Sequence, residues 1–253
     1  MPTKRAMVTG ASSGIGEAFA RDLAKRGFSL VLVARRHDAL AAVARELGAD
    51  TELLVLDLTE EDAVKQAIRR LETGNISVMV NNAGVGYRGM VAEQSDENIS
   101  RLSRLNFETP MRLTRAALAP MLASRAGAII NVVSMGAFQP VPYLNVYAAT
   151  KAGLLSFTEA LADEVRSRGV LIQALCPGNI PTGFQEVAGT KGSPFDKTPS
   201  MSAETVARRS LDAALCGGPP LLVPAALDRV SVFVQRFLPR AVARRVAGNL
   251  MRP

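Results

Sequence analysis

Long apolar runs are absent from this chain of 253 residues. No stretch approaches the 18 or so consecutive apolar residues that a membrane-spanning helix needs. Residues 2–5 lead straight into a short apolar segment, without the hydrophobic region of a secretory signal. We therefore expect a cytoplasmic protein, and peripheral contact with a membrane stays open.

Cysteine and histidine are also scarce, with two cysteines and a single histidine. Cys176 lies in an apolar segment and Cys216 near the end of an expected helix, a spacing that fits neither a disulfide nor a metal site. Free thiols suit a reducing cytoplasm. We expect no metal centre, and we expect His37 to be exposed and not catalytic.

Charge is unevenly distributed along the chain, which has a formal net charge of +7. From Val223 onward the chain contains six arginines and a single acidic residue, Asp228, which gives this segment a net charge of +5. Apolar residues alternate with these arginines. The pattern predicts a basic amphipathic tail over about residues 224–253 that breaks near Pro239. Such a tail packs on another subunit, the reading we favour, or lies on anionic lipid. No basic groove with interleaved aromatic residues is indicated, so we expect no nucleic-acid partner.

Strand-like apolar runs alternate with helical patterns along the whole chain. The runs lie near residues 6–9, 29–34, 51–56, 77–80, 128–133, 170–176 and 220–223. This alternation predicts an α/β fold, with a single doubly wound Rossmann-type domain over residues 1–253, a parallel sheet of about seven strands and helices on both faces. Ligands of such folds bind at the carboxyl ends of the strands.

A glycine-rich turn follows the first run, and a helical pattern follows the turn. Strand, glycine turn and helix occur in the order that a dinucleotide site requires. Glycines let the backbone approach a pyrophosphate closely, and the helix N-terminus offers free N–H groups to the anion. The turn predicts cofactor contacts from Gly10, Ser12, Ser13, Gly14, Ile15 and Gly16.

Tyr147 and Lys151 are four residues apart in a helical pattern and so share one face. Bringing a tyrosine pKa from near 10 to neutrality requires roughly 4 kcal/mol of preference for the phenolate. A cation about 4 Å away in partly solvated protein supplies roughly that amount. We therefore expect Lys151 to lower the pKa of Tyr147, which then acts as a general acid or base.

Together the Gly-x-x-x-Gly-x-Gly turn and the Tyr-x-x-x-Lys pair resemble the short-chain dehydrogenase/reductase family. The resemblance covers almost the whole chain. It extends to four further segments in register, which are Leu56-Asp57-Leu58, Asn81-Asn-Ala-Gly84, Ser134 thirteen residues before Tyr147, and Pro177-Gly-Asn-Ile-Pro-Thr182.

The resemblance implies a role for each of these segments. The implied catalytic residues are Asn106, Ser134, Tyr147 and Lys151. The implied cofactor contacts beyond the glycine turn are Asp57, Leu58, Asn82, Ala83, Gly84, Tyr147, Lys151, Pro177, Gly178, Ile180 and Thr182. The family also implies a mobile substrate loop over about residues 178–203, and a homodimer or homotetramer that forms through the helices carrying Asn106 and Tyr147.

Cofactor preference is indicated by Arg35 and Arg36, which follow the second run. An NAD site would have a carboxylate there, whereas arginines bind the 2′-phosphate of NADP through forked, charge-assisted hydrogen bonds. We therefore expect NADP(H), although Ser13 stands where many NADP-preferring relatives have a basic residue. Asp38 is interpreted as a helix N-cap.

Asn106 lies on an expected helix over about residues 97–123, four residues before Pro110. Proline has no N–H, so the carbonyl of Asn106 loses its usual helical donor. In the family this carbonyl binds a water that links the active-site lysine to solvent. A simple helix kink is the alternative, and both can hold together.

These features predict an NADPH-dependent reductase that interconverts a carbonyl and an alcohol, with Tyr147 as the acid or base. The apolar residues expected around the substrate are Met135, Phe138, Val141, Pro142, Tyr143 and Phe184. Two alternatives stay open: an NAD-dependent alcohol dehydrogenase, and a dinucleotide-sensing or membrane-associated binding protein without turnover.

Overall fold

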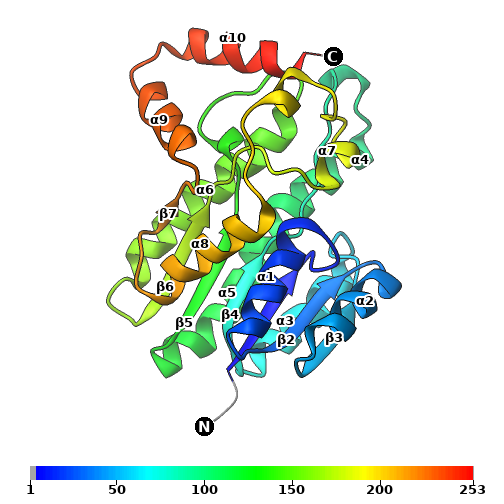
Figure 1. Cartoon of the computed structure of the whole chain (residues 1–253), viewed down its shortest axis with the longest axis vertical. Coiled ribbons are helices and arrows are strands. Elements are labelled where there is room, and N and C mark those ends of the chain that lie inside the picture. Colours follow the sequence, from blue (N-terminus) through cyan, green and yellow to red (C-terminus); the bar gives the residue numbers. More distant parts are fainter. Residues whose placement is uncertain (1–3, 253) are drawn as a thin grey trace.

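Seven parallel strands form one sheet in the computed structural model, which describes residues 4–252 (Figure 1). The strands are β1 (Arg5–Thr9), β2 (Ser29–Ala34), β3 (Thr51–Val55), β4 (Ile76–Asn81), β5 (Gly127–Val132), β6 (Val170–Leu175) and β7 (Leu221–Leu222). Their order is β3-β2-β1-β4-β5-β6-β7, which confirms the predicted sheet. The order reverses between β1 and β4, and dinucleotides bind at such a switch point.

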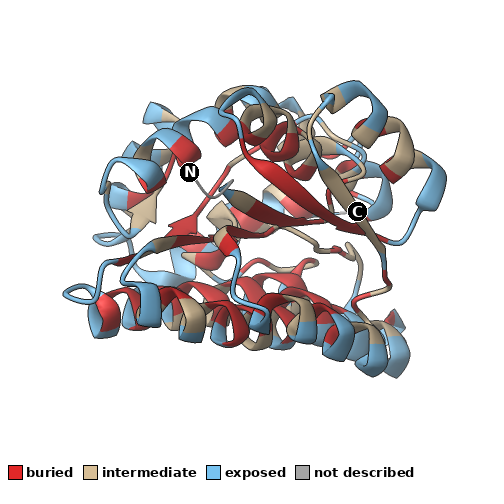
Figure 2. Cartoon of the chain, turned by 90° about the horizontal axis from the view of Figure 1, so that it is seen from below, coloured by how far each residue is buried: buried red, intermediate tan, exposed pale blue. Residues whose placement is uncertain are grey.

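Two helical layers cover the sheet (Figures 1 and 2). One layer contains α1 (Gly14–Lys25), α2 (His37–Leu47) and α8 (Ala203–Leu215), and the other contains α3 (Glu61–Glu72), α5 (Thr109–Ser124) and α6 (Asn145–Val165). Every residue of β2 is buried, which explains its uninterrupted apolar sequence. A doubly wound domain is therefore present, as predicted.

The start of α2 corrects one expectation. The N-cap of α2 is Arg36, so Asp38 lies inside the first turn and its side chain is fully exposed. The prediction of Asp38 as the N-cap was wrong, because the backbone is already helical from His37. The histidine side chain is exposed, as expected.

The helix expected over residues 97–123 consists of three consecutive pieces. The first piece is α4 (Asp96–Ser103), which is followed by a π-helical turn (Arg104–Glu108) and then by α5. At this turn the N–H of Thr109 bonds the carbonyl of Arg104, five residues back. Because Pro110 has no N–H, the regular pattern cannot continue here, and a π turn accommodates the missing bond.

The segment after β6 and the helices after β7 lie over the carboxyl ends of the strands (Figure 1). The segment 178–203 contains the short helix α7 (Phe184–Val187) and a 3₁₀ turn (Pro194–Lys197). Two helices follow β7, α9 (Ala226–Gln235) and α10 (Arg240–Met251), with Pro239 between them as predicted. Within residues 4–252, no helix has the length and apolar character needed to cross a membrane.

Candidate active site

Glycine is required in the turn between β1 and α1 by both conformation and space. Gly10 and Gly14 have φ values of +66° and +59°, the left-handed region that favours glycine. A Cβ on Gly16 would collide with the carbonyl of Gly10 and the side-chain amide of Asn82. Ser13 is the N-cap of α1 but its side chain makes no capping bond, so the first N–H groups of α1 remain available to an anion.

Beneath this turn, Thr9 joins β1 to the segment after β4. Its Oγ1 accepts the N–H groups of Asn82 at 2.9 Å and Ala83 at 3.0 Å. In return, Nδ2 of Asn82 donates to the carbonyl of Thr9 at 2.9 Å. Sequence reasoning found Asn82 and Ala83 but missed Thr9. The available signal was a hydroxyl residue at the end of an otherwise apolar, buried strand.

At the ends of β2 and β3, two arginines meet residues predicted to contact the cofactor. Nη1 of Arg35 lies 3.4 Å from Oδ2 of Asp57, and Nη2 of Arg36 lies 3.4 Å from Oγ of Ser12. Burial would raise the pKa of Asp57, but hydrogen bonds from Thr59 and the charge of Arg35 lower it overall. The structure thus brings Arg36 to the glycine turn and Arg35 to Asp57, and Asp57 is ionised near neutral pH.

Tyr147 and Lys151 lie on α6, and Ser134 lies just after β5. The ammonium of Lys151 donates to the carbonyl of Val132 at 2.8 Å and lies 5.8 Å from the centre of the Tyr147 ring. Oγ of Ser134 accepts the N–H of Gly136 at 3.1 Å. The Ser134 hydroxyl is close enough to the phenol of Tyr147 to act on its pKa, which it lowers. The three predicted catalytic side chains therefore meet at the carboxyl end of β5.

The electrostatics of this group differ from the expectation. Burial raises the pKa of Tyr147 to about 12, although the hydrogen bond with Ser134 acts to lower it. Burial also lowers the pKa of Lys151 to about 8. The prediction that Lys151 lowers the pKa of Tyr147 to near neutrality was wrong for this structure, because both groups are enclosed and desolvation dominates. Tyr147 is a protonated phenol at neutral pH.

Asn106, in the π-helical turn, is fully buried and its side chain is held by Val85. Its Oδ1 accepts the N–H of Val85 at 2.9 Å, and its Nδ2 donates to the carbonyl of Val85 at 2.8 Å. A Cβ on Gly84 would lie 3.1 Å from this Oδ1 and 3.6 Å from Nζ of Lys151. The amide therefore fixes the turn after β4, close to Lys151. Sequence reasoning did not find the role of Val85, whose contacts are made by its backbone.

The segment 178–203, which was expected to be the substrate loop, is folded against Tyr147. The ring of Phe184 packs on Tyr147, with centroids 5.5 Å apart and planes at 50°. The N–H of Arg88 donates to the carbonyl of Ala188 at 2.8 Å, which ties the end of α7 to the segment after β4. Phe184 is thus beside the site as predicted, but it covers the tyrosine.

Several of the other residues expected around the substrate pack into the protein. Met135 and Phe138 join a cluster that includes Leu154 and Val232, and Val141 is buried in the main core. The expected pocket wall is thus partly core, because the turn after β5 folds inward under α9.

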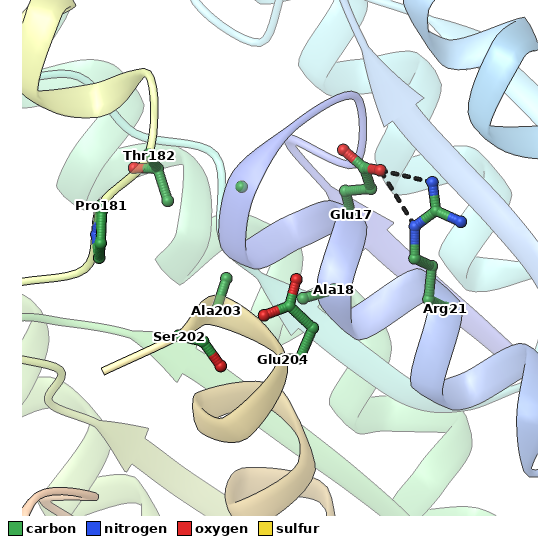
Figure 3. A pocket seen from close by; sticks show the side chains of 9 residues that line it. Glu17, Ala18, Arg21, Pro181, Thr182, Ser202, Ala203 and Glu204 are labelled. Carbon is green, nitrogen blue, oxygen red and sulfur yellow. Dashed lines mark hydrogen bonds and ion pairs between the residues drawn. The ribbon is translucent and has the colours of Figure 1, made fainter. Parts of the chain in front are cut away.

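A cavity of about 300 Å³ lies between the starts of α1 and α8 (Figure 3). Gly14 and Thr182 form part of its lining, and a Cβ on Gly14 would lie 3.1 Å from the Thr182 side chain. The predicted contact residue Thr182 therefore reaches the glycine turn. Nearby, the N–H of Met135 donates to the carbonyl of Pro177 at 3.0 Å, which places the Pro177-Gly178 segment beside Ser134.

Comparison with known proteins agrees with this geometry. The sequence model of the family described as short chain dehydrogenase matches residues 4–191. The chain is 34% identical over 190 residues to the very-long-chain 3-oxoacyl-CoA reductase of Bos taurus, a match that covers 72% of this chain and 61% of the bovine protein. It is 34% identical over 181 residues to the 3-oxoacyl-(acyl-carrier-protein) reductase of Escherichia coli, covering 71% of this chain and 74% of that protein.

A solved structure shows the same fold over nearly the full length. It is a short-chain dehydrogenase from Sphingobium yanoikuyae in complex with NADPH, with 30% identity, a TM-score of 0.83 and coverage of 94% of this chain and 97% of that one. The sheet order, the glycine turn and the family match all agree. The chain therefore belongs to the short-chain dehydrogenase/reductase family of oxidoreductases.

Proposed function

We propose that this protein is an NADP(H)-dependent oxidoreductase that reduces an apolar ketone to an alcohol, with 3-oxoacyl thioesters as the first substrates to test. The observation that carries the proposal is the convergence of Ser134, Tyr147 and Lys151 at the carboxyl end of β5, on the same edge of the parallel sheet as the glycine turn after β1. The names of the bovine and E. coli relatives support the thioester class.

The residues present fit a bound NADP(H). The turn formed by Gly10, Gly14 and Gly16 leads directly into α1, whose first N–H groups would bind a pyrophosphate. The side chain of Arg35 is half exposed beside Asp57, so its guanidinium is accessible to a 2′-phosphate. Arg36 lies beside Ser12 and adds a second cation. The NADPH and NADP named with similar solved structures support this cofactor.

When bound, NADPH supplies the hydride for the reduction. Tyr147 is protonated at neutral pH and donates its phenolic proton to the carbonyl oxygen of the substrate. The hydroxyl of Ser134 binds the same oxygen and orients it. Lys151, with a pKa of about 8, is largely charged at neutral pH and stabilises the phenolate that forms.

Proton resupply is assigned to the main-chain carbonyl of Asn106. Pro110 cannot donate to it, and the Asn106 side chain is already engaged by Val85. This carbonyl is therefore suited to bind a water next to Lys151. The water then returns a proton from solvent through Lys151 to Tyr147.

The decisive experiment follows NADPH oxidation with 3-oxoacyl thioesters of increasing chain length and with cyclic and aryl ketones. We expect turnover that rises with chain length and disappears in Tyr147→Phe. A parallel series with NADH tests the alternative of an NAD-dependent enzyme. Lack of turnover with every ketone, in a protein that binds NADPH, would contradict the reductase proposal and favour a binding role.

A further inference from the structure

The outer faces of α9 and α10 expose apolar residues that no other part of residues 4–252 covers. Of the thirteen large apolar side chains exposed in the described residues, eight lie between Leu227 and Val246. Phe237 and Leu227 are 74% and 68% exposed. Phe233 and Phe237 contact each other edge to face, with centroids 5.3 Å apart. We call the exposed side chains of residues 227–246 the tail face.

Both helices are nevertheless anchored through their inner sides. Val232 of α9 is buried in the cluster under the turn after Ser134, and Ala243, Ala247 and Met251 of α10 are also buried. Nε of Arg88 donates to the carbonyl of Met251 at 2.8 Å. The outer side chains are therefore held in fixed positions on an ordered support.

The tail face is basic as well as apolar. Six arginines lie between Arg229 and Arg252, and none of them forms an ion pair among the residues that the structure describes. The one acid of this region, Asp228, is directed inward against Gly178. A cleft of about 220 Å³ between β7 and α9 repeats this chemistry, with apolar walls and two arginines, Arg229 and Arg236.

Charge complementarity decides what this surface fits. A two-fold contact with a second copy would bring the same patch to itself and place arginine against arginine, without carboxylates to pair with them. An anionic bilayer instead offers negative headgroups to the arginines and an apolar interior to the phenylalanines and leucines. The structure thus favours lipid over the subunit packing that the sequence alone suggested.

We propose that α9 and α10 form a peripheral docking surface for anionic lipid bilayers. The surface adjoins the substrate side of the protein, since Gly248 of α10 packs near Pro142 and Arg88 ties α10 to the segment after β4 (Figure 1). Docking would hold the substrate loop close to the bilayer. The proposal stands independently of the proposed function, because lipid binding is measured without turnover.

The test is co-sedimentation of the full chain with vesicles of phosphatidylcholine, alone or mixed with phosphatidylserine. We expect binding to the mixed vesicles, little binding to phosphatidylcholine alone, and release as salt is raised. Arg240→Glu with Arg244→Glu should weaken binding about tenfold or more, since each basic residue near an anionic surface contributes about 1 kcal/mol. Phe233→Ser with Phe237→Ser should weaken it to a similar extent.

Matched controls use equivalent changes outside the tail face. Arg69→Glu with Arg166→Glu reverses two exposed charges on other helices, and Val55→Ser with Leu215→Ser removes two exposed apolar side chains. Both controls should bind as the wild type does, and melting temperatures should show that every variant is folded. Equal binding to neutral vesicles, or equal losses in the controls, would overturn the proposal. A concentration-dependent dimer that dissociates on Phe233→Ser with Phe237→Ser would also overturn it and assign the face to a second copy.

Discussion

Helices α1 and α9 are both amphipathic, yet they use their apolar side chains in opposite ways. In α1, Phe19 and Leu23 have no exposed surface, because the helix is enclosed by the sheet and α8. In α9 only Val232 is buried, while Phe233 is 61% exposed. Helical periodicity thus predicts that an apolar face exists, but the partner that covers it depends on what packs alongside.

The two regions also differ in whether the family's sequence model matches them. The family match covers residues 4–191, which include the glycine turn, the predicted catalytic residues and the first part of the segment 178–203. The tail face lies beyond that range. Its properties must therefore be argued from its own contacts and charges, whereas the catalytic region can be tested against a family mechanism.

The largest effect is expected from Tyr147→Phe, which removes only the proton donor. We expect kcat to fall by about 10²–10⁴-fold, the usual contribution of general acid catalysis. NADPH affinity should be nearly unchanged. The matched control is Tyr87→Phe, the same loss of a hydroxyl at a residue without a predicted role, and kcat should stay within a few-fold of the wild type. Steady-state kinetics and cofactor titration distinguish these outcomes, and a Tyr147→Phe enzyme with more than about a tenth of wild-type kcat would point to another acid.

The contrast between α1 and the tail face can be tested directly by making the same substitution, phenylalanine to alanine, in each of them. Phe19→Ala should destabilise the protein by about 3–5 kcal/mol, because it leaves a cavity in a close-packed core. Phe237→Ala should change the free energy of unfolding by no more than about 0.5 kcal/mol, since the ring is mostly exposed. Denaturant unfolding measures both values. Comparable losses would mean that the tail face is buried in solution, by another subunit or by the chain itself.

The sequence predicted the sheet well because its strands are continuous apolar runs bounded by glycine or polar residues. β1 to β6 match the expected runs within one or two residues at each end. The sequence also indicated that Ser134, Tyr147 and Lys151 lie together, because their spacing is fixed by a strand end and by one face of α6, while their catalytic roles stay predictions. These features depend on residues that are close together in the sequence, so the sequence alone reveals them.

What the sequence did not predict depends on tertiary enclosure. The pKa of Tyr147 is set by burial under Phe184, which comes from a loop 37 positions away. The bond from the Val85 backbone to Asn106 joins segments 21 residues apart and involves no distinctive side chain at Val85. Thr9 serves two backbone N–H groups of the β4 turn, a role that only the sheet order reveals. In each case the spacing along the sequence identifies the residue or its neighbours, whereas the tertiary packing determines its pKa or its hydrogen-bond partners.

The next largest effect is expected on the preference for NADPH over NADH when the two arginines after β2 are replaced. In Arg35→Ala with Arg36→Ala, NADPH affinity should fall by about tenfold or more while NADH affinity changes little, because only NADPH has a 2′-phosphate for charge-assisted bonds. Arg69→Ala with Arg166→Ala serves as a control for net charge. Fluorescence titration of both cofactors gives the ratio. Equal affinities of the wild type for NADPH and NADH would contradict the assignment of these arginines.

The pH dependence of reduction should follow Lys151 and not Tyr147. With a pKa of about 8, Lys151 loses its charge above that pH, so kcat/KM should fall about tenfold per pH unit beyond it, while Tyr147 stays protonated until about pH 12.

The effect of Lys151 on stability has the opposite sign to its effect on the rate. Between pH 8 and the ordinary value of 10.5, the unfolded chain binds more protons at this lysine, so its contribution to stability rises with pH. Rate profiles of the wild type, and unfolding curves of the wild type and Lys151→Met, separate the two effects. If kcat/KM did not change up to pH 9, the result would argue against a role for the Lys151 ammonium.

The smallest effect is expected from Pro110→Ala, which tests whether the π-helical turn serves proton transfer or only shape. Alanine restores an N–H that can bond the carbonyl of Asn106 and is the better helix former, so thermal stability should hold or rise. NADPH affinity should change little, since the side chain of Asn106 remains tied to Val85. If the carbonyl binds the relay water, kcat should fall a few-fold, most where proton supply limits turnover, while the fold stays intact. Melting temperature, cofactor titration and the pH–rate profile of the same variant provide the comparison, with a crystal structure to show whether the bond between residues 110 and 106 has formed. An unchanged profile in a variant that contains this bond would leave the π turn with a structural role alone, because the water would have lost its acceptor without any cost to the reaction.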